Sequence, residues 1–358
     1  MTILSLELNE LNFHYIKQFV AEGKLPAFRR LLEKQHLTET RSEKAYPYLE
    51  PWIQWPTVYT GKTYDEHGVF RLGDIVYTEH EQIWETLEAE GMSVGAVSPM
   101  NAANRCKDAA FFLPDPWTNT PITADARLTK LFELVRETVN ANASDDLSMA
   151  TMGRKILGLA LPYLRPASMP LYFRILGMAV RHKFAKAAFL DSLLADITLT
   201  MIRRERPDFV SLFLNAGAHI QHHHMFDSAA YSGERANPSW YSSAADDKTD
   251  PLLFIYEVYE TIIEQCLAMD DVRVIITTGL SQIPNERDHY QYRFIDFGRM
   301  KNLVDLPDKA SIEARMSRDF LIACPDAETA AACKEQLAKA TCGGKPFFIV
   351  EDREKTLF

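Results

Sequence analysis

The chain has few cysteines and no long apolar run, and both shortages limit its class. Its 358 residues include five cysteines, an odd number without the spacing of metal knuckles. This excludes a disulfide-stapled or zinc-knuckle scaffold and predicts reduced thiols in a cytoplasmic protein. No stretch is long and apolar enough to predict a transmembrane helix. Residues 1–12 lack the basic start and long apolar core of a signal peptide.

Acidic residues outnumber basic residues in the chain. Lys and Arg total 39 against 49 Asp and Glu, and the net charge of −10 argues against a general nucleic-acid binder. The apolar content of 47% and the charged content of 25% are ordinary for a soluble globular protein. The length suits one large α/β domain or a domain with a cap. We therefore expect a cytoplasmic protein, with a peripheral position at the inner membrane face as an extension of that prediction.

One long segment contains no acidic residue. Between Leu147 and Leu190 there is neither Asp nor Glu. Its basic residues are Arg154, Lys155, Arg165, Arg174, Arg181, Lys183 and Lys186. Apolar pieces and prolines separate them, which indicates amphipathic helices. One interpretation is a surface for an anionic membrane, or a cover over a site for a lipid-linked or polyanionic substrate. The alternative is a helical cap whose basic residues face water.

Apolar runs of strand length alternate with segments of helix length. Strands are expected at 3–8, 92–97, 208–214, 272–277, 320–324 and 346–350, and helices at 13–22, 26–34, 81–91, 251–269 and 327–340. This order predicts an α/β fold with a doubly wound, mostly parallel sheet and helices on both faces. Such sheets bind ligands beyond the carboxyl ends of their strands. The expected site therefore follows Leu6, Leu214 and Thr277 and includes the loop before Pro51.

The segment from Glu50 to Phe70 has the most distinctive pattern. Pro51 suits the first position of a helix, and Gly61 suits a left-handed C-terminal cap. A short helix is therefore predicted to begin at the carboxylate of Glu50. The free N–H groups and partial positive charge of a helix N-terminus attract anions such as phosphate. A buried aromatic helix followed by an ordinary turn is the alternative interpretation.

Three pieces of the chain resemble a known family. They are Thr60-Gly61 followed by Glu-His-Gly-Val at 66–69, Leu-Pro-Ala-Phe-Arg-Arg-Leu at 25–31, and Phe-Leu-Pro-Asp-Pro-Trp-Thr at 112–118. Together they resemble the alkaline phosphatase superfamily, most closely its type I phosphodiesterase and nucleotide pyrophosphatase branch. The resemblance implies a core whose first half is 1–125, a basic helical cap inserted at 126–204, and a second half at 205–358. That second half ends in a strand–helix–strand unit.

The resemblance also implies metal ligands and a nucleophile, and here the match is uneven. After the first strand, where the family has an Asp, this chain offers Glu7, Asn9 and Glu10, of which Glu7 and Asn9 are the candidate metal ligands. A polar turn is the alternative. The family's hydroxyl nucleophile falls on Pro51, which has none. Glu50, as a replacement nucleophile, a general base or a ligand, and Thr57 or Thr60, in a shifted role, are the candidate catalytic residues.

Four of the ten histidines lie within six residues, at the end of the fourth expected strand. His222 matches the family's histidine, whereas the family's Asp position is Ala218. If the segment is helical, His219, His222 and His223 share one face at i, i+3 and i+4. Imidazoles at that spacing can bind one transition-metal ion. A structural role for clustered core histidines is the alternative.

The next strand end departs from the family. The Asp and His expected after residues 272–277 are replaced by Gly279 and Leu280. One of the two family metal sites is therefore expected to be dismantled. His289 is the candidate for the last family ligand. Arg287 and Arg293 are candidates for clamping an anionic group through bidentate contacts.

The leading hypothesis is a metal-dependent hydrolase or transferase that acts on a phosphate ester or phosphodiester. The resemblance implies a divalent ion, with zinc or manganese favoured, and a small-molecule or lipid-linked phosphorylated substrate. Two alternatives remain open. One is a non-catalytic family member that serves as a binding or assembly subunit. The other is a single-metal histidine–carboxylate enzyme with non-phosphoryl chemistry.

Overall fold

The computed structural model describes residues 1–35, 37–42, 44–45, 48–141, 149–238, 249–285, 294–315 and 319–358. The chain forms two compact units. The first comprises 1–136 and 149–286, and the second comprises 137–148 and 287–358. Residues 149–204, expected in a cap, thus belong to the same unit as the central sheet. Residues 287–358, expected in the second half of the core, are grouped in the second unit.

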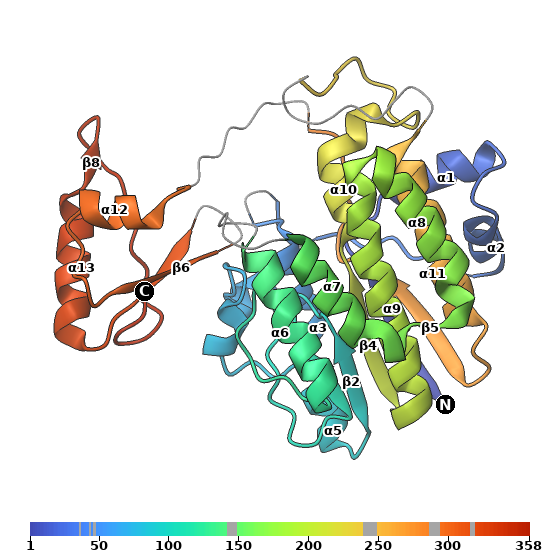
Figure 1. The fold of residues 1–358 in the computed structure, drawn as a ribbon, viewed down its shortest axis with the longest axis horizontal. Coiled ribbons are helices and arrows are strands. Elements are labelled where there is room, and N and C mark those ends of the chain that lie inside the picture. Colours follow the sequence, from blue (N-terminus) through green and yellow to red (C-terminus); the bar gives the residue numbers. More distant parts are fainter. Residues whose placement is uncertain are drawn as a thin grey trace. The chain divides into compact units, whose positions relative to one another are not determined.

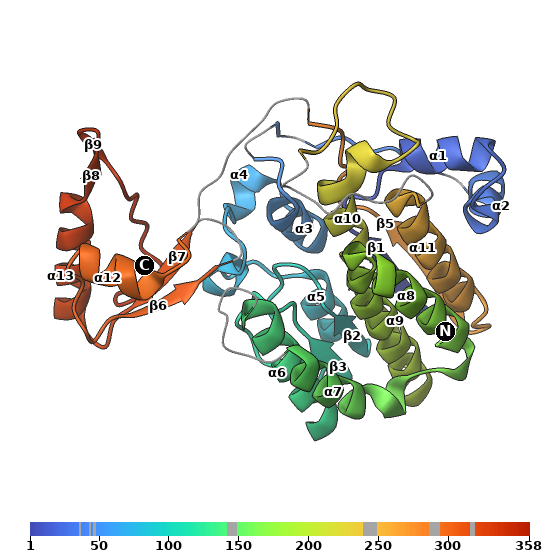
Figure 2. The ribbon, with the colours of Figure 1, turned by 45° about the horizontal axis from the view of Figure 1, so that its top comes forward.

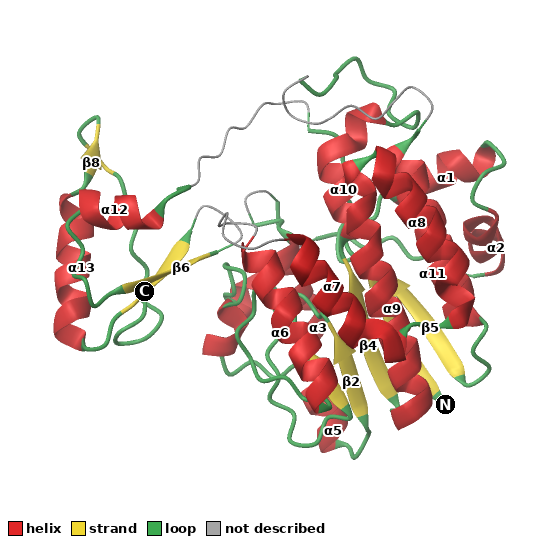
Figure 3. Cartoon of the chain, viewed as in Figure 1, coloured by secondary structure: helices red, strands yellow, loops and turns green. Residues whose placement is uncertain are grey.

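A five-stranded parallel sheet forms the centre of the first unit. Its strands, in spatial order, are β3 (Phe111–Leu113), β2 (Val94–Val97), β4 (Phe209–Leu214), β1 (Thr2–Leu8) and β5 (Val272–Thr277). Every neighbouring pair in this sheet is parallel. Figure 3 shows its strands among the surrounding helices, and Figure 1 shows α7, α8 and α9 in front of them. The prediction of a doubly wound α/β fold is confirmed.

The helices of the first unit follow the expected order. They are α1 (Phe13–Ala21), α2 (Pro26–Lys34), α3 (Pro51–Thr60), α4 (Tyr64–His67), α5 (Ile83–Ala89), α6 (Ala126–Ala141), α7 (Met149–Ala160), α8 (Met169–Arg181), α9 (Lys186–Glu205), α10 (Ala216–His224) and α11 (Pro251–Leu267). Helix α3 has the predicted ends, with Pro51 at its first position and Gly61 at φ 62° as its cap. No helix within the described ranges combines the length and apolar character needed to cross a bilayer.

Alternate side chains of the central strands face opposite layers. The parallel register places Ser5 and Glu7 of β1 beside Ser211 and Phe213 of β4. This face packs under α3 and α5 in an aromatic cluster. The cluster includes Trp55, Tyr59, Trp84, Phe112 and Phe213. The opposite face, which carries Leu4, packs against the layer of α9 and α11, since these helices contact β4 and β5. Glu7 is therefore a carboxyl group that faces a core layer.

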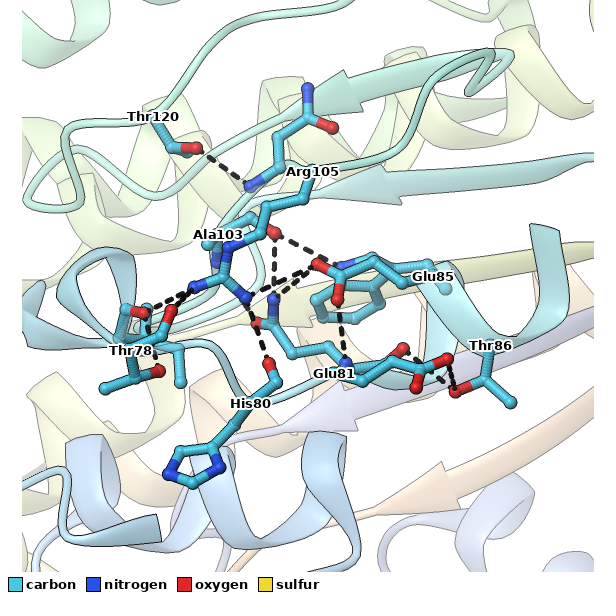
Figure 4. A network of polar contacts seen from close by, with 12 residues as sticks. Thr78, His80, Glu81, Glu85, Thr86, Ala103, Arg105 and Thr120 are labelled. Atoms are coloured by element: carbon cyan, nitrogen blue, oxygen red, sulfur yellow. Dashed lines mark hydrogen bonds and ion pairs between the residues drawn. The ribbon is translucent and has the colours of Figure 1, made fainter. Parts of the chain in front are cut away.

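A polar network anchors the loops after β2 (Figure 4). Arg105 donates to the backbone carbonyls of Ile75, Thr78 and His80. The amide of Gln82 caps α5 and also exchanges hydrogen bonds with the backbone of Ala103 at 3.0 and 3.1 Å. These contacts satisfy loop carbonyls with side chains and so fix the irregular backbone on this side of the sheet.

The second unit contains α12 (Phe297–Leu303), β6 (Ser311–Ala314), β7 (Phe320–Ala323), α13 (Ala327–Lys339), β8 (Thr341–Cys342) and β9 (Lys345–Pro346). The expected strand at 346–350 is wrong, because only Lys345–Pro346 is a strand there and it pairs with β8. β7 pairs instead with β6 and with the chain end, where Ile322 and Phe358 exchange backbone hydrogen bonds of 2.7 and 3.2 Å. β6 and the segment that ends at Phe358 therefore occupy both edges of β7, so residues 346–350 cannot pair with it.

Candidate active site

Three ionisable side chains from different elements come together at the carboxyl end of the sheet. Glu10 follows β1, Glu50 precedes α3, and His222 lies on α10, which follows β4. Helices α3 and α10 both lie at this end of the sheet (Figure 2). His222 Nε2 is 3.1 Å from Glu10 Oε2, and Glu50 interacts electrostatically with both residues. We call Glu10, Glu50 and His222 the acidic triad.

Glu10 occupies an unusual backbone conformation. Its φ of 57° lies in the left-handed region, which non-glycine residues adopt at an energetic cost. Three hydrogen bonds hold the backbone there: its N–H donates to Thr278, while its carbonyl accepts from Gln282 N–H and from the Gln221 side chain. The side chain is only 4% exposed. The strained turn thus aims one buried carboxylate at His222.

A chain of hydrogen bonds sets the tautomer of His222. Tyr256 OH donates to Gln221 Oε1 at 2.7 Å, and Gln221 Nε2 donates to Gln282 Oε1 at 3.1 Å. This leaves Gln282 Nε2 to donate to His222 Nδ1 at 2.6 Å. A neutral His222 therefore carries its proton on Nε2, where it donates to Glu10. Both ring nitrogens are thus engaged.

The pKa values of Glu50 and His222 are both raised. Burial raises the pKa of Glu50 to about 7, and the negative charge of Glu10 adds to the rise while His222 opposes it. Burial also lowers the pKa of His222, but the hydrogen bond and charge of Glu10, with the charge of Glu50, outweigh it and raise that pKa. His222 remains 54% exposed and so lies where a ligand can reach it. Near neutral pH the triad can both accept and donate a proton.

Glu50 stands at the N-terminus of α3. Its backbone is extended, and its side chain makes no capping hydrogen bond to the helix. Since Pro51 has no N–H, the amide of Trp52 is the first that the helix presents. The N–H groups and partial charge of this helix end favour an anion. The sequence-based prediction of a carboxylate beside an anion-attracting helix end agrees with this geometry.

Glu7 and Asn9 lie deeper than expected for ligands. Glu7 is 2% exposed and accepts hydrogen bonds from Ser211 and Tyr59 at 2.6 Å and from Ser5 at 3.1 Å. Asn9 accepts from Trp55 Nε1 at 2.7 Å and donates to Asn215 at 2.8 Å. Their polar atoms bind the protein itself and do not face the triad. Odd-numbered residues of β1 point toward α3, so the buried aromatic layer covers Glu7.

This environment predicts a pH-dependent cost of burying Glu7. Desolvation raises its pKa from 4.5 to about 7, so the folded state holds the proton more tightly than the unfolded state. Stability should therefore fall as pH rises from about 4.5 through about 7, by about 3 kcal/mol in full. Glu7→Gln should reduce this fall by a similar amount. Urea denaturation across that range checks it, with Glu33→Gln at an exposed site as control; an unchanged pH profile in Glu7→Gln would contradict it.

The histidine cluster is split between two neighbourhoods. The rings of His219 and His223 lie 4.8 Å apart, while His222 turns to Glu10. His224 bonds Asp227 through Nδ1 at 2.8 Å. Partial burial and the neighbouring imidazoles lower the pKa of His223 to about 4. The expected three-histidine face is thus corrected: residues i+3 and i+4 lie about 100° apart around a helix, enough for His222 and His223 to meet different partners.

Thr57 belongs to another cluster. Its Oγ1 lies 3.0 Å from Nε2 of His67, a ring that is 3% exposed. Val69 N–H donates to His67 Nδ1 at 3.0 Å, so the neutral ring carries its proton on Nε2 and donates to Thr57. His67 in this tautomer cannot remove the Thr57 proton. The geometry brings Thr57 together with His67 and not with the acidic triad.

The described residues contain no group of three or more His, Cys, Asp or Glu side chains close enough to hold a metal ion. The expected ligand His289 and the expected anion clamp Arg287 and Arg293 lie outside the described residues. Their roles stay predictions. Glu10 and Glu50 supply carboxylate oxygens, the donors that hard divalent cations prefer.

From the sequence, Glu10 was one of three polar candidates after β1 and was not selected as a ligand, and Gln282 was not a candidate. Glu10 stands just past the end of β1, a position that the strand-end rule covers, so its place in the sequence was a usable signal. The sequence contains no signal for Gln282, because its role depends on the side chain of Gln221 more than fifty residues away. Tertiary packing, not spacing, creates that contact.

A comparison with known families finds one match. The model of the type I phosphodiesterase / nucleotide pyrophosphatase family matches residues 4–339, nearly the whole chain. No curated protein matches the sequence.

Proposed function

Because the chain belongs to the type I phosphodiesterase / nucleotide pyrophosphatase family, we propose that it hydrolyses or transfers a phosphate ester or phosphodiester at the acidic triad. The observation that carries the proposal is the convergence of Glu10, Glu50 and His222 from three separate elements. They meet at the sheet edge where α/β folds bind ligands. The proposed substrate is a small-molecule or lipid-linked phosphorylated compound.

The N-terminus of α3 is the proposed anion site. The Trp52 amide and the partial charge of the helix would receive phosphoryl oxygens. Two carboxylates at the same place would repel that anion, so a cation is required between them. A protonated His222, favoured by its raised pKa, supplies one positive charge.

A divalent ion is the second proposed source of positive charge, since the family is generally metal-dependent. Glu10 and Glu50 are the residues proposed to hold it, and zinc and manganese are the proposed ions. Bound there, such an ion would polarise a phosphoryl oxygen. The engaged ring nitrogens of His222 and the deep positions of Glu7 and Asn9 do not favour the larger ligand set expected from the sequence.

Water or an acceptor hydroxyl is the proposed attacking group. The helix start carries Pro51 where the resemblance implies a hydroxyl nucleophile, so no covalent enzyme intermediate is proposed there. Glu50, with a pKa of about 7, would accept the proton of the attacking group. Gln282 and Glu10 engage both ring nitrogens of His222, so His222 would hold Glu10 in place and the leaving oxygen would take its proton from water.

A second candidate function is a non-catalytic binding or assembly subunit. The specific observation that favours it is the replacement of the implied Asp and His by Gly279 and Leu280, together with the engaged nitrogens of His222. A single-ion site with non-phosphoryl chemistry is the third. Metal content separates the second candidate from the other two.

The test uses purified full-length protein with bis(p-nitrophenyl) phosphate, assayed with zinc, manganese or magnesium and with EDTA. Elemental analysis runs in parallel. We expect metal-stimulated cleavage that Glu10→Gln and His222→Ala both weaken. Bound metal without cleavage of any phosphoester would favour the third candidate. Neither metal nor cleavage would overturn the proposal in favour of the second.

A further inference from the structure

Helix α8 has two apolar faces, of which only one is covered. Its inner face buries Leu171, Tyr172 and Ile175. Its outer face exposes Phe173, Leu176 and Val180 by 71%, 59% and 81% of their surfaces. The spacing i, i+3, i+7 places these three on one stripe. Contiguous exposed apolar side chains of this size mark interaction surfaces. We call these three residues the outer stripe.

Uncompensated basic charge lies next to this stripe. Arg181, Lys183 and Lys186 follow it directly and are exposed, and in the part of the chain that the structure describes they bind no carboxylate. Arg174 differs, because it pairs with Glu257 and stacks on Phe254. Since residues 147–190 contain no acid, all of the chain's negative charge lies elsewhere.

The neighbouring helix α7 repeats this combination. Leu157 is 44% exposed and Leu161, just after α7, is 60% exposed. Arg154 and Lys155, one turn earlier, are exposed as well. Both α7 and α8 lie in front of the sheet in Figure 1. Exposed apolar side chains with Lys and Arg close in sequence thus occur on both helices.

Hydrogen bonds to the buried helix α9 hold the start of α8 in place. Asp196 of α9 accepts hydrogen bonds from Arg165 N–H at 3.0 Å, from Ser168 Oγ at 2.5 Å and from Tyr172 OH at 3.1 Å. These three bonds fasten the start of α8 to the buried helix α9. The outer stripe is therefore presented by an ordered helix, so binding would not have to pay for folding it.

We propose that α8 and the adjoining basic residues dock the protein on an anionic lipid bilayer. Apolar side chains with flanking Lys and Arg are the composition of helices that lie in a membrane interface. Anionic headgroups attract the basic residues, whereas the acidic remainder of the protein is repelled, which orients this face toward the membrane. A second copy of the chain fits poorly, because a symmetric contact through this surface would bring together two basic segments that hold no acidic residue to pair with them.

Vesicle co-sedimentation of the full chain tests the proposal. The probes are vesicles of phosphatidylcholine with and without phosphatidylglycerol, at low and high salt. We expect binding only to vesicles that contain phosphatidylglycerol, and weaker binding as salt rises. Binding that is equal for both compositions, or no binding at low salt, would overturn the proposal.

Two variants with matched controls assign the binding to this surface. Replacing Arg181, Lys183 and Lys186 with Gln together should lower the partition coefficient on the order of a hundredfold, about fivefold for each cation. Phe173→Ser with Val180→Ser should lower it at least about tenfold. Lys107→Gln and Leu267→Ser, exposed at other sites, should leave binding unchanged.

All substituted side chains are exposed, so the variants should keep the wild-type circular dichroism spectrum and thermal midpoint. If the controls weaken binding as much as the two variants do, another surface is responsible and the proposal is overturned. The same holds if sedimentation velocity shows a wild-type dimer that Phe173→Ser dissociates, because a second copy would then cover the stripe. Phosphoester cleavage is not the readout, so this test stands apart from that of the proposed function.

Discussion

Replacing Glu50 with Gln is expected to lower the rate of phosphoester cleavage by about 10²–10⁴-fold. The substitution keeps the size of the side chain and the start of α3, but it removes the group that would accept a proton from the attacking water. It also removes one of the two carboxylates proposed to hold the cation. Steady-state kinetics with bis(p-nitrophenyl) phosphate measures the loss, which should appear in kcat rather than in KM alone.

The pH profile gives this prediction a second readout. Glu50 acts only when deprotonated, so wild-type activity should rise with pH through the pKa of about 7 that burial gives Glu50. A protonated His222 supplies positive charge beside the anion site, so its raised pKa should bring a decline at higher pH, which makes the profile bell-shaped. In Glu50→Gln the rising limb should disappear while the residual activity remains.

Thr57→Val is the control for this prediction, because Thr57 lies on the same helix and was the other catalytic candidate. Its hydroxyl accepts a hydrogen bond from His67, not from the triad. We expect Thr57→Val to keep most of the activity. If Thr57→Val abolished cleavage and Glu50→Gln did not, a shifted hydroxyl nucleophile would replace the mechanism proposed here.

Most of the fold could be predicted because its signals are local. Helix α3 begins at Pro51 and ends before Gly61, as proline and glycine chemistry require. The buried strands β1, β2 and β4 and the edge strand β5 appear as short apolar or β-branched runs between helices. The prediction of a strand at 346–350 was wrong because Phe358 pairs with Ile322 instead. Neither segment's sequence reveals that contact.

The site was predicted less completely because its groups meet through tertiary structure. The expected sheet edge includes Glu50 and His222, and both lie there in the structure, while their roles stay predictions. Which of the carboxylates near the end of β1 faces His222 depends on the direction of each side chain. Glu7 lies on β1 but points into the layer under α3, while Glu10, three residues later, is turned toward His222 by its left-handed backbone. Sequence spacing alone does not distinguish these two carboxylates.

Trp55 explains why the family's Asp is missing after β5. A Cβ atom added at Gly279 would lie 2.8 Å from Trp55 Cε2, and Gly279 has a φ of 67°. The indole therefore fills the space that a side chain at position 279 would need, and the backbone there favours glycine. Trp55 also donates to Asn9, so it supports the turn that leads to Glu10. At position 279, where the resemblance implies an Asp, the indole thus leaves no room for a side chain.

Trp55→Ala is accordingly expected to lower the free energy of unfolding by about 3–5 kcal/mol, because it empties a fully buried site and leaves Asn9 without its donor. Urea denaturation measures this loss. Trp52→Ala, at a half-buried indole on the same helix, should cost less. Gly279→Asp should also destabilise the protein alone, but less in the Trp55→Ala background, where the space is open. If the losses in unfolding free energy of the two single variants were additive in the double variant, Trp55 would not be the reason why position 279 requires glycine.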